Sequence, residues 1–422
     1  MVDQVIAGAA LAVTVGLAVL RPTILGVRFT PGYAALVGVA MLLGAGLLTP
    51  AQMLDAARVQ WRPLVTLTSI MTITGVVHEV GAFDRLAAVI EARARTRSAA
   101  HTFTVVFALS AITPALLNND AAILILTPLV VALTRRLYAR DTDIARAFGF
   151  AVFLAAGVAP FVVSNPMNMI VAEGAGIGFN AYARVMLPVS VAGALITYGV
   201  MRIVFARVLR EAVAAPAPPN PTTIHRHAAE RPAVALMVIV FAAYPFAAWV
   251  RVEIWSVAAA GALASLVLCR AYRIAPLRRA VAHVSIDILV FLWGIFLVAL
   301  ALRGVGAVDH LRALYDVEGG ARLAAIGVTS ALGSALIDNH PMALLNLMAI
   351  DASSDPRPIL AALVGGDIGP RLLPIGSLAG LLWIDLLRRA GIEVGVARFV
   401  RVGTLALLPT LAGSLALLWL LG

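Results

Sequence analysis

Two short polar clusters interrupt long apolar stretches of the chain, and the two clusters resemble each other. Residues 118–120 read Asn-Asn-Asp, and residues 338–340 read Asp-Asn-His. Amides and carboxylates can bind a small polar solute through hydrogen bonds, and carboxylates can also carry protons. The hydrocarbon core of a bilayer satisfies none of these groups, so they persist only where protein or a water-filled cavity surrounds them. We therefore interpret both clusters as the lining of a solute site.

A second polar break follows each cluster. Residues 164–168 read Ser-Asn-Pro-Met-Asn, and residues 365–371 read Gly-Gly-Asp-Ile-Gly-Pro-Arg. Paired breaks in corresponding halves of a chain mark the central binding site of a transporter. Helix capping alone would need only one Asn per cluster and no charge inside lipid. The predicted substrate-binding residues are Asn118, Asn119, Asn165, Asn168, Asn339, His340 and Asn346.

Two carboxylates of these polar segments are candidates for proton coupling. Asp120 comes from the first half and Asp367 from the second, and carboxylates within a membrane are typical of proton relays. Arg371, four residues after Asp367, either neutralises that carboxylate as an ion-pair partner or leaves it free to titrate. Two further acids, Asp287 and Asp385, are either packing partners or members of a proton path.

The composition places these residues in a membrane. Hydrophobic residues make up 61% of the chain and charged residues 13%, whereas soluble domains are about half apolar and a quarter charged. Apolar runs near the length that spans lipid recur throughout the chain. We predict an all-α polytopic membrane protein with spans at 4–20, 31–48, 61–80, 145–163, 182–206, 232–250, 253–269, 284–302 and 402–420.

The order of segments repeats on either side of a proline-rich stretch at 211–232, which we interpret as a cytoplasmic linker. Each half has three spans, an amphipathic segment, a re-entrant hairpin, a broken helix and a last span. Each half therefore crosses five times, and the odd number inverts the second half. The predicted repeats are 1–210, with hairpin 101–134 and broken helix 145–178, and 233–422, with hairpin 323–350 and broken helix 358–390.

The charge pattern predicts the orientation. All 32 basic residues are arginine, and most fall in loops that are cytoplasmic if the N-terminus lies outside. The net charge of +10 is explained by contact with anionic lipid, since no compact basic domain could bind nucleic acid. The single cysteine, Cys269, excludes a three-thiolate metalloid site within one chain.

Enzyme motifs are incomplete. The run His78-Glu79-Val80-Gly81-Ala82 lacks the second histidine of a zinc helix, and the sequence contains no phosphate-binding glycine loop. We therefore predict that the chain is not an enzyme and uses no cofactor and no metal.

Several of these segments resemble the ArsB arsenical pump membrane protein family, part of the ion transporter superfamily. The resemblance lies in residues 119–128, in Ser164-Asn165 with Asn168, and above all in residues 366–383. It implies export of arsenite and antimonite in exchange for protons across a bacterial inner membrane. It also implies an optional ATPase partner, ArsA, on the cytoplasmic side. Two positions depart from the family pattern: His340 replaces an apolar residue, and Arg371 replaces a common lysine.

The residue types agree with that substrate. Arsenite near neutral pH is an uncharged trihydroxide, which amides and carboxylates can bind without fixed cations. Two alternatives remain open. One is a sodium/proton or sodium-coupled carboxylate transporter of the same superfamily, and the other is a passive channel subunit of an ATPase-driven pump.

Overall fold

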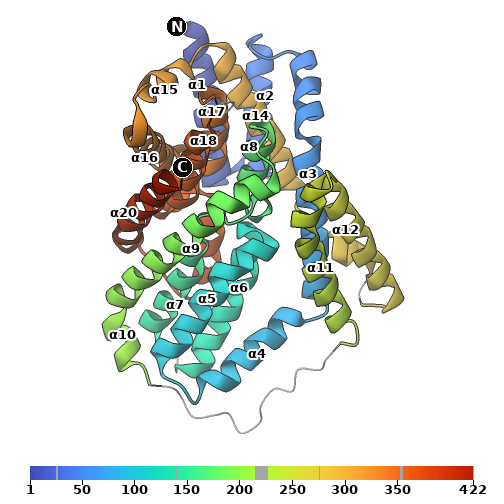
Figure 1. Cartoon of the computed structure of the whole chain (residues 1–422), viewed down its shortest axis with the longest axis vertical. Coiled ribbons are helices and arrows are strands. Elements are labelled where there is room, and N and C mark those ends of the chain that lie inside the picture. Colours follow the sequence, from blue (N-terminus) through green and yellow to red (C-terminus); the bar gives the residue numbers. More distant parts are fainter. Residues whose placement is uncertain (25–26, 139–140, 214–226, 275, 352–354, 422) are drawn as a thin grey trace.

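The computed structural model describes residues 1–24, 27–138, 141–213, 227–274, 276–351 and 355–421 (Figure 1). The predicted linker is therefore described only at its edges, and residues 214–226 lie outside the described residues. Helices account for nearly all of the regular structure. As predicted, the chain is an α-helical polytopic membrane protein, and eight helices of the described part are long and apolar enough to cross a bilayer.

The first half begins with three long elements and continues into a helical hairpin. Its elements are α1 (Val2–Leu20), β1 (Thr23–Ile24), β2 (Val27–Arg28), α2 (Pro31–Gly44), α3 (Pro50–Glu79), α4 (Ala82–Ala94), α5 (Ala99–Leu117), α6 (Asn119–Leu137), α7 (Thr142–Ala155), η1 (Val162–Ser164), α8 (Pro166–Gly174), α9 (Phe179–Val204) and α10 (Ala206–Glu211).

The second half repeats this order after the linker. Its elements are α11 (Glu230–Trp249), α12 (Ile254–Ala271), α13 (Leu277–Val281), α14 (Ile286–Gly304), α15 (Asp309–Leu314), α16 (Gly319–Ile337), α17 (Asn339–Ala349), α18 (Arg357–Ile368), η2 (Gly369–Arg371), η3 (Pro374–Gly376), α19 (Leu378–Arg389) and α20 (Val396–Leu420).

Contacts between the halves are exchanged reciprocally. Helix α2 packs along α14, and their counterparts α12 and α3 pack together in the same way. The return arm of each hairpin contacts the other half's broken helix, because α6 meets α19 and α17 meets α8. The amphipathic helices α4 and α15 lie at opposite ends of the molecule (Figure 1). Reciprocal contacts and opposed ends are what an inverted repeat requires.

Polar residues fix where the helices begin. Thr49 and Gln52 form a reciprocal capping box at the start of α3, with Pro50 in the first turn. The hydroxyls of Ser98, Ser285 and Ser377 accept backbone N–H groups at the starts of α5, α14 and α19. These caps satisfy donors that the apolar surroundings could not.

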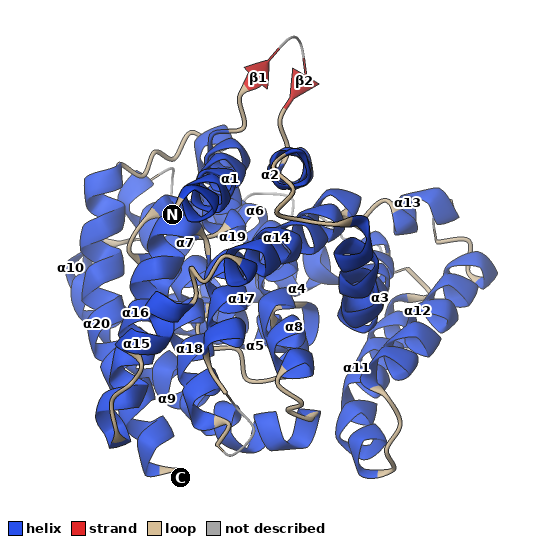
Figure 2. Ribbon diagram, turned by 90° about the horizontal axis from the view of Figure 1, so that it is seen from above, coloured by secondary structure: helices blue, strands red, loops and turns tan. Residues whose placement is uncertain are grey.

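Two expectations about the boundaries were wrong. The span expected at 31–48 is a helix of only 14 residues, since α2 ends at Gly44. The break in the first broken helix begins before the polar residues 164–168, because α7 already ends at Ala155. Besides the helices, β1 and β2 pair antiparallel in a short ribbon that projects beyond them (Figure 2).

Glycines allow the second broken helix to pack against its hairpin. Helices α16 and α18 share one of the most extensive contacts in the described chain. A Cβ atom at Gly365 would overlap the backbone oxygen of Gly327, and one at Gly369 would overlap that of Ala331. The two backbones therefore touch directly, and this contact places Asp367 beside the hairpin.

Candidate functional site

The two hairpins turn at single residues of matching geometry. Asn118 ends α5 with φ 88° and ψ 160°, and Asp338 ends α16 with φ 75° and ψ 150°. Each side chain then caps the return helix: Asn118 Oδ1 accepts the N–H of Ala121 at 2.9 Å, and Asp338 Oδ1 accepts that of His340 at 3.0 Å. The sequence similarity between the clusters thus corresponds to one shared local structure.

A small cavity of about 30 Å³ lies where the two tips meet the two breaks. The volume is enough for one or two water molecules. Side chains from both halves line it, and most of the predicted site residues are among them. The predicted residues that line the cavity are Asn119, Asp120, Asn165, Asn339, His340, Asp367 and Arg371.

Asp367 joins the two breaks. Its Oδ1 accepts from Asn165 Nδ2 at 2.9 Å, and its Oδ2 accepts from the N–H of Ala159 at 2.9 Å and from Asn168 Nδ2 at 3.2 Å. Asn168 Nδ2 also donates to the hydroxyl of Tyr182 at 2.7 Å, and that hydroxyl donates to the carbonyl of Ala159 at 3.1 Å. A carboxylate of the second half is thus held by amides of the first.

Several polar atoms at the tips are buried without a partner among the described residues. Three of them belong to residues that line the cavity: Asn119 Oδ1, Asn339 Oδ1 and His340 Nε2. The other imidazole nitrogen, Nδ1, lies 3.0 Å from Asp338 Oδ1. Buried polar atoms normally have partners, so unpaired ones around a cavity indicate where a solute can bind.

The carboxylate of Asp120 is buried at the cavity and forms no hydrogen bond within the described chain. Asn118 caps the helix that carries it, and Asn119 lines the same cavity. The two carboxylates that line the cavity therefore differ in their hydrogen bonding. Asp367 is held by three donors, whereas Asp120 is free to meet a solute or a proton.

The hydrogen bonds of Arg371 go to α7 and α9 rather than to Asp367. Its guanidinium donates to the carbonyl of Leu154 at 2.7 Å and to the hydroxyl of Thr197 at 3.1 Å. No carboxylate of the described residues lies within ion-pair distance of it. The cation therefore satisfies the carbonyl end of α7, where a positive charge is favourable, and it also lines the cavity.

Asn346 lies outside the cavity. Its Oδ1 accepts from the hydroxyl of Tyr315 at 2.6 Å, and its Nδ2 donates to Ser330 at 3.0 Å. Ser330 in turn donates to the carbonyl of Ala362 at 2.6 Å. This chain of bonds connects α17, α16 and α18 and supports the second tip from behind.

The two further acids are packing partners. Asp287 accepts from the hydroxyl of Thr30 and from the N–H of Gly32, and so fastens α2 to α14. Asp385 pairs with Arg388 and Arg389 on its own helix. Both lie outside the cavity, so neither belongs to the site.

Three contributors to the site escaped sequence reasoning: the N–H of Ala159, the hydroxyl of Tyr182, and Ser377, which lines the cavity. A backbone N–H carries no residue-type signal. Tyr182 offered a weak one, since a tyrosine inside a spanning helix needs a partner for its hydroxyl.

Comparison with known proteins agrees with this architecture. The profile of the citrate transporter family (CitMHS) matches residues 17–380. The chain belongs to the citrate transporter family. The arsenical pump membrane protein of Escherichia coli K12 is one relative, and it is 28% identical over 327 residues, which cover 75% of this chain and 76% of the relative. The arsenical pump membrane protein of Yersinia enterocolitica matches to the same extent.

Two solved transporter structures share the fold of this chain. The YdaH transporter of Alcanivorax borkumensis aligns over 99% of this chain and 97% of its own, with a TM-score of 0.60 and 18% identity. MtrF of Neisseria gonorrhoeae aligns over 99% and 94%, with a TM-score of 0.59 and 12% identity. The two solved structures therefore show that this chain has the same fold as they do.

Proposed function

We propose that this transporter exports arsenite and antimonite, as uncharged trihydroxides, in exchange for protons across a bacterial inner membrane. The observation that carries the proposal is the cavity between the two hairpin tips, where amide oxygens and an imidazole nitrogen stay unpaired beside two carboxylates. A trihydroxide offers three O–H donors and three acceptors to such a lining. The arsenical pump relatives suggest the same class of solute.

The charges around the cavity favour a neutral solute over a tricarboxylate. Asp120 and Asp367 face it, and Asp338 lies directly behind His340. Among the described residues that line the cavity, one guanidinium is present, that of Arg371, and its hydrogen bonds go to α7 and α9. Citrate would bring further negative charge to this acidic lining, and like charges in a poorly hydrated site repel strongly.

Competition for a carboxylate provides a coupling mechanism. The carboxylate of Asp120 lines the cavity and forms no hydrogen bond within the described chain. In its ionised form it can accept hydrogen bonds from the O–H groups of the solute, and once protonated it loses part of that acceptor capacity. A proton that binds Asp120 therefore favours release of the solute, and release of the proton favours binding of the next solute. Solute and proton thus occupy the site alternately, as exchange requires.

We further propose that both hairpins are re-entrant and that the two halves, 1–210 and 233–422, are inverted in the bilayer. With the N-terminus outside, the arginine-rich ends, α4 and the linker lie in the cytoplasm. That face is where an ATPase such as ArsA would dock. Asn119, Asn165, Asn168, Asn339 and His340 contact the solute in this proposal, whereas Asn118 and Asn346 position the tips.

Transport into everted vesicles tests the proposal. We expect energised vesicles to accumulate arsenite, with Asp120→Asn and Asp367→Asn each abolishing accumulation. Asp385→Asn serves as the matched control, since it removes a carboxylate outside the cavity, and it should transport normally. Accumulation that persists in both cavity variants would refute their coupling roles.

One observation favours a second candidate. The matching family profile is described as that of a citrate transporter, so a sodium-coupled carboxylate carrier is the natural alternative. The same vesicles distinguish the two, because that carrier would take up citrate in a sodium gradient and ignore arsenite. Arsenite transport that needs ATP and the ATPase but survives collapse of the proton gradient would instead indicate a passive channel subunit.

A further inference from the structure

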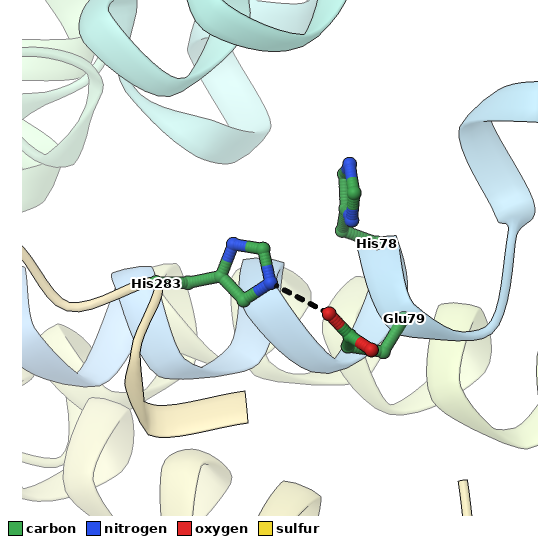
Figure 3. Close-up of side chains that lie close together, drawn as sticks. All are labelled: His78, Glu79 and His283. Carbon is green, nitrogen blue, oxygen red and sulfur yellow. Dashed lines mark hydrogen bonds and ion pairs between the residues drawn. The ribbon is translucent and has the colours of Figure 1, made fainter. Parts of the chain in front are cut away.

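At the end of α3, a histidine and a glutamate that are neighbours in sequence meet a second histidine from a distant part of the chain (Figure 3). His78 and Glu79 are the last two residues of that helix, and His283 lies between α13 and α14. Within the described ranges, these three form the one group of His, Cys, Asp or Glu whose ligand atoms all lie within 4.8 Å of one another. His283 Nε2 is 3.0 Å from Glu79 Oε1, and the two imidazole rings are 5.0 Å apart.

We propose that His78, Glu79 and His283 bind one divalent transition-metal ion, with Zn²⁺ as the representative case. Imidazole nitrogen and carboxylate oxygen are ligands that zinc and its neighbours prefer. With metal–ligand bonds of about 2.1 Å, two ligand atoms of a tetrahedral site lie about 3.4 Å apart. The ligand atoms of the three side chains all lie within 4.8 Å of one another, and rotation about side-chain bonds would have to close the remaining gap.

The backbone holds the two contributing segments together. Helix α13 packs on α3, and Ala280 is fully buried at their contact. Gly75 makes the approach possible, because a Cβ there would lie 2.8 Å from both the carbonyl oxygen of Ala280 and the Cβ of His283. The position of His283 is therefore fixed by the fold, and the metal would not have to order a free loop.

Exposure leaves room for the remaining ligands. His78 and His283 are exposed, and Glu79 is partly buried, so water can complete the coordination sphere. Arg279 is the competing group: its Nη1 lies 4.0 Å from Glu79 Oε2, and its side chain is 67% exposed. A weak, exposed ion pair of this kind gives way to metal coordination at little cost.

A bound ion would join parts of both halves. Helix α3 belongs to the first half, and the α13–α14 connection belongs to the second. The ring of His78 also lies 6.3 Å from that of Phe83 on α4, which leads into the first hairpin. The predicted orientation places the group on the cytoplasmic face. The site is separate from the solute cavity, so it does not depend on the proposed substrate.

The experiment measures metal binding to the full-length protein, which is purified through an affinity tag that contains no histidine. Co²⁺ serves as the spectroscopic probe, and Zn²⁺ is followed by its effect on the melting temperature, since an ion that binds only the folded state stabilises it. We expect one Co²⁺ per chain and a higher melting temperature with Zn²⁺. His78→Ala and His283→Ala should each weaken binding by about tenfold or more, the loss seen even for outer-shell changes.

Two matched controls and one conservative variant complete the design. His101→Ala and His310→Ala remove exposed histidines outside the group and should leave the affinity unchanged. Glu79→Gln keeps a partner for His283 but removes the charged ligand, so weaker binding in a variant with normal melting confirms a ligand role. The proposal is overturned if the wild-type protein binds no Co²⁺, or if His78→Ala and His283→Ala bind it as tightly as the wild type.

Discussion

Asn118 and Asp338 share a backbone conformation that L-residues rarely adopt, one at each hairpin tip. Their φ values of 88° and 75° lie in a region that glycine occupies readily, and the conformation costs about 1–3 kcal/mol for other residues. The chain nevertheless keeps a polar side chain at both positions, and each caps the following helix. The proposal that the two tips form the solute site explains why this strain is kept at two symmetric positions beside the cavity.

Replacing Asn118 by glycine separates the effect of the strained backbone on stability from the effect of the side chain on transport. Glycine relieves the strain, and a glycine N-cap costs only a few tenths of a kcal/mol. We therefore expect Asn118→Gly to melt at the same or a higher temperature while transport falls, because the first turn of α6 loses its anchor. Asn118→Ala keeps the strain and loses the cap, so it should melt lower. Thermal melting and vesicle uptake of both variants check this, and equal destabilisation by the two would contradict it.

The unpaired amide oxygens at the tips lead to a second prediction. Asn119 Oδ1 and Asn339 Oδ1 have no partner in the described chain, so removing either amide breaks no bond through its oxygen. We expect Asn119→Ala and Asn339→Ala to lower transport at least severalfold while shifting the melting temperature little. Uptake at increasing arsenite concentration should show weaker apparent affinity. A large loss of stability with unchanged affinity would assign both residues to structure.

Asn346 should behave in the opposite way. It links Tyr315 to Ser330 inside the protein, and loss of a buried partner costs about 1–3 kcal/mol. We expect Asn346→Ala to lower the melting temperature clearly. Tyr315→Phe should cost less on its own, and the double variant should cost less than the sum of the two changes because they remove one shared bond. Strict additivity in a thermal double-mutant cycle would show that the bond contributes nothing.

Some features of the fold could be predicted from the sequence, and others could not. The polar triplets predicted both hairpins and their tips, because polar groups in lipid have few permitted places. The break before Ser164 was misplaced, since residues 156–161 contain no strong polar signal and the chain opens there to bring the N–H of Ala159 to Asp367. The sequence could not predict the pairing of Glu79 with His283, because the two residues are 204 positions apart and only the packing of α13 on α3 brings them together.

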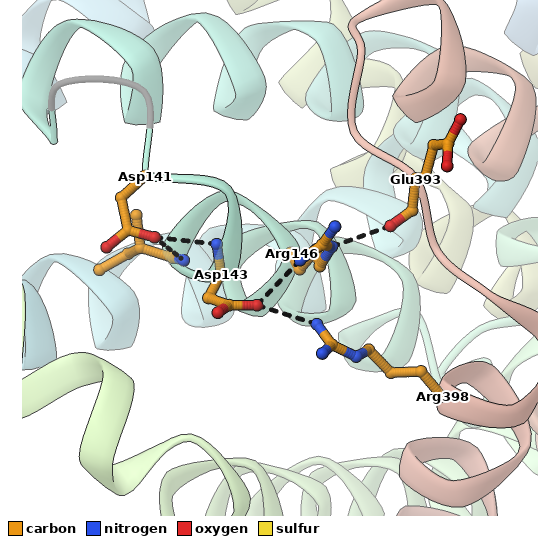
Figure 4. Close-up of polar contacts among 6 residues, drawn as sticks. Asp141, Asp143, Arg146, Glu393 and Arg398 are labelled. Carbon is orange, nitrogen blue, oxygen red and sulfur yellow. Dashed lines mark hydrogen bonds and ion pairs between the residues drawn. The ribbon is translucent and has the colours of Figure 1, made fainter.

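A polar cluster at the start of α7 gives the last prediction, on pH (Figure 4). Asp143 Oδ1 accepts from Arg398 of the second half and from Arg146, each at 2.9 Å, and Arg146 also donates to the carbonyl of Glu393. The hydrogen bond from Arg398 has the largest effect, and together with the one from Arg146 it holds the pKa of Asp143 below its usual value. A carboxyl whose folded pKa is lowered stabilises the protein above its unfolded pKa of about 3.9, and loses that contribution as the pH falls through the folded pKa.

Asp143→Asn should therefore lower the melting temperature slightly at pH 7, since partly exposed pairs contribute about 0.2–1 kcal/mol. The gap between variant and wild type should close as the pH falls below about 4. Melting curves from pH 7 to pH 3 measure it. Asp55→Asn is the control, because the Asp55 pair with Arg58 stays within α3 and joins no second element. A gap of the same size at pH 3 would mean that Asp143 acts through packing or capping rather than through its charge.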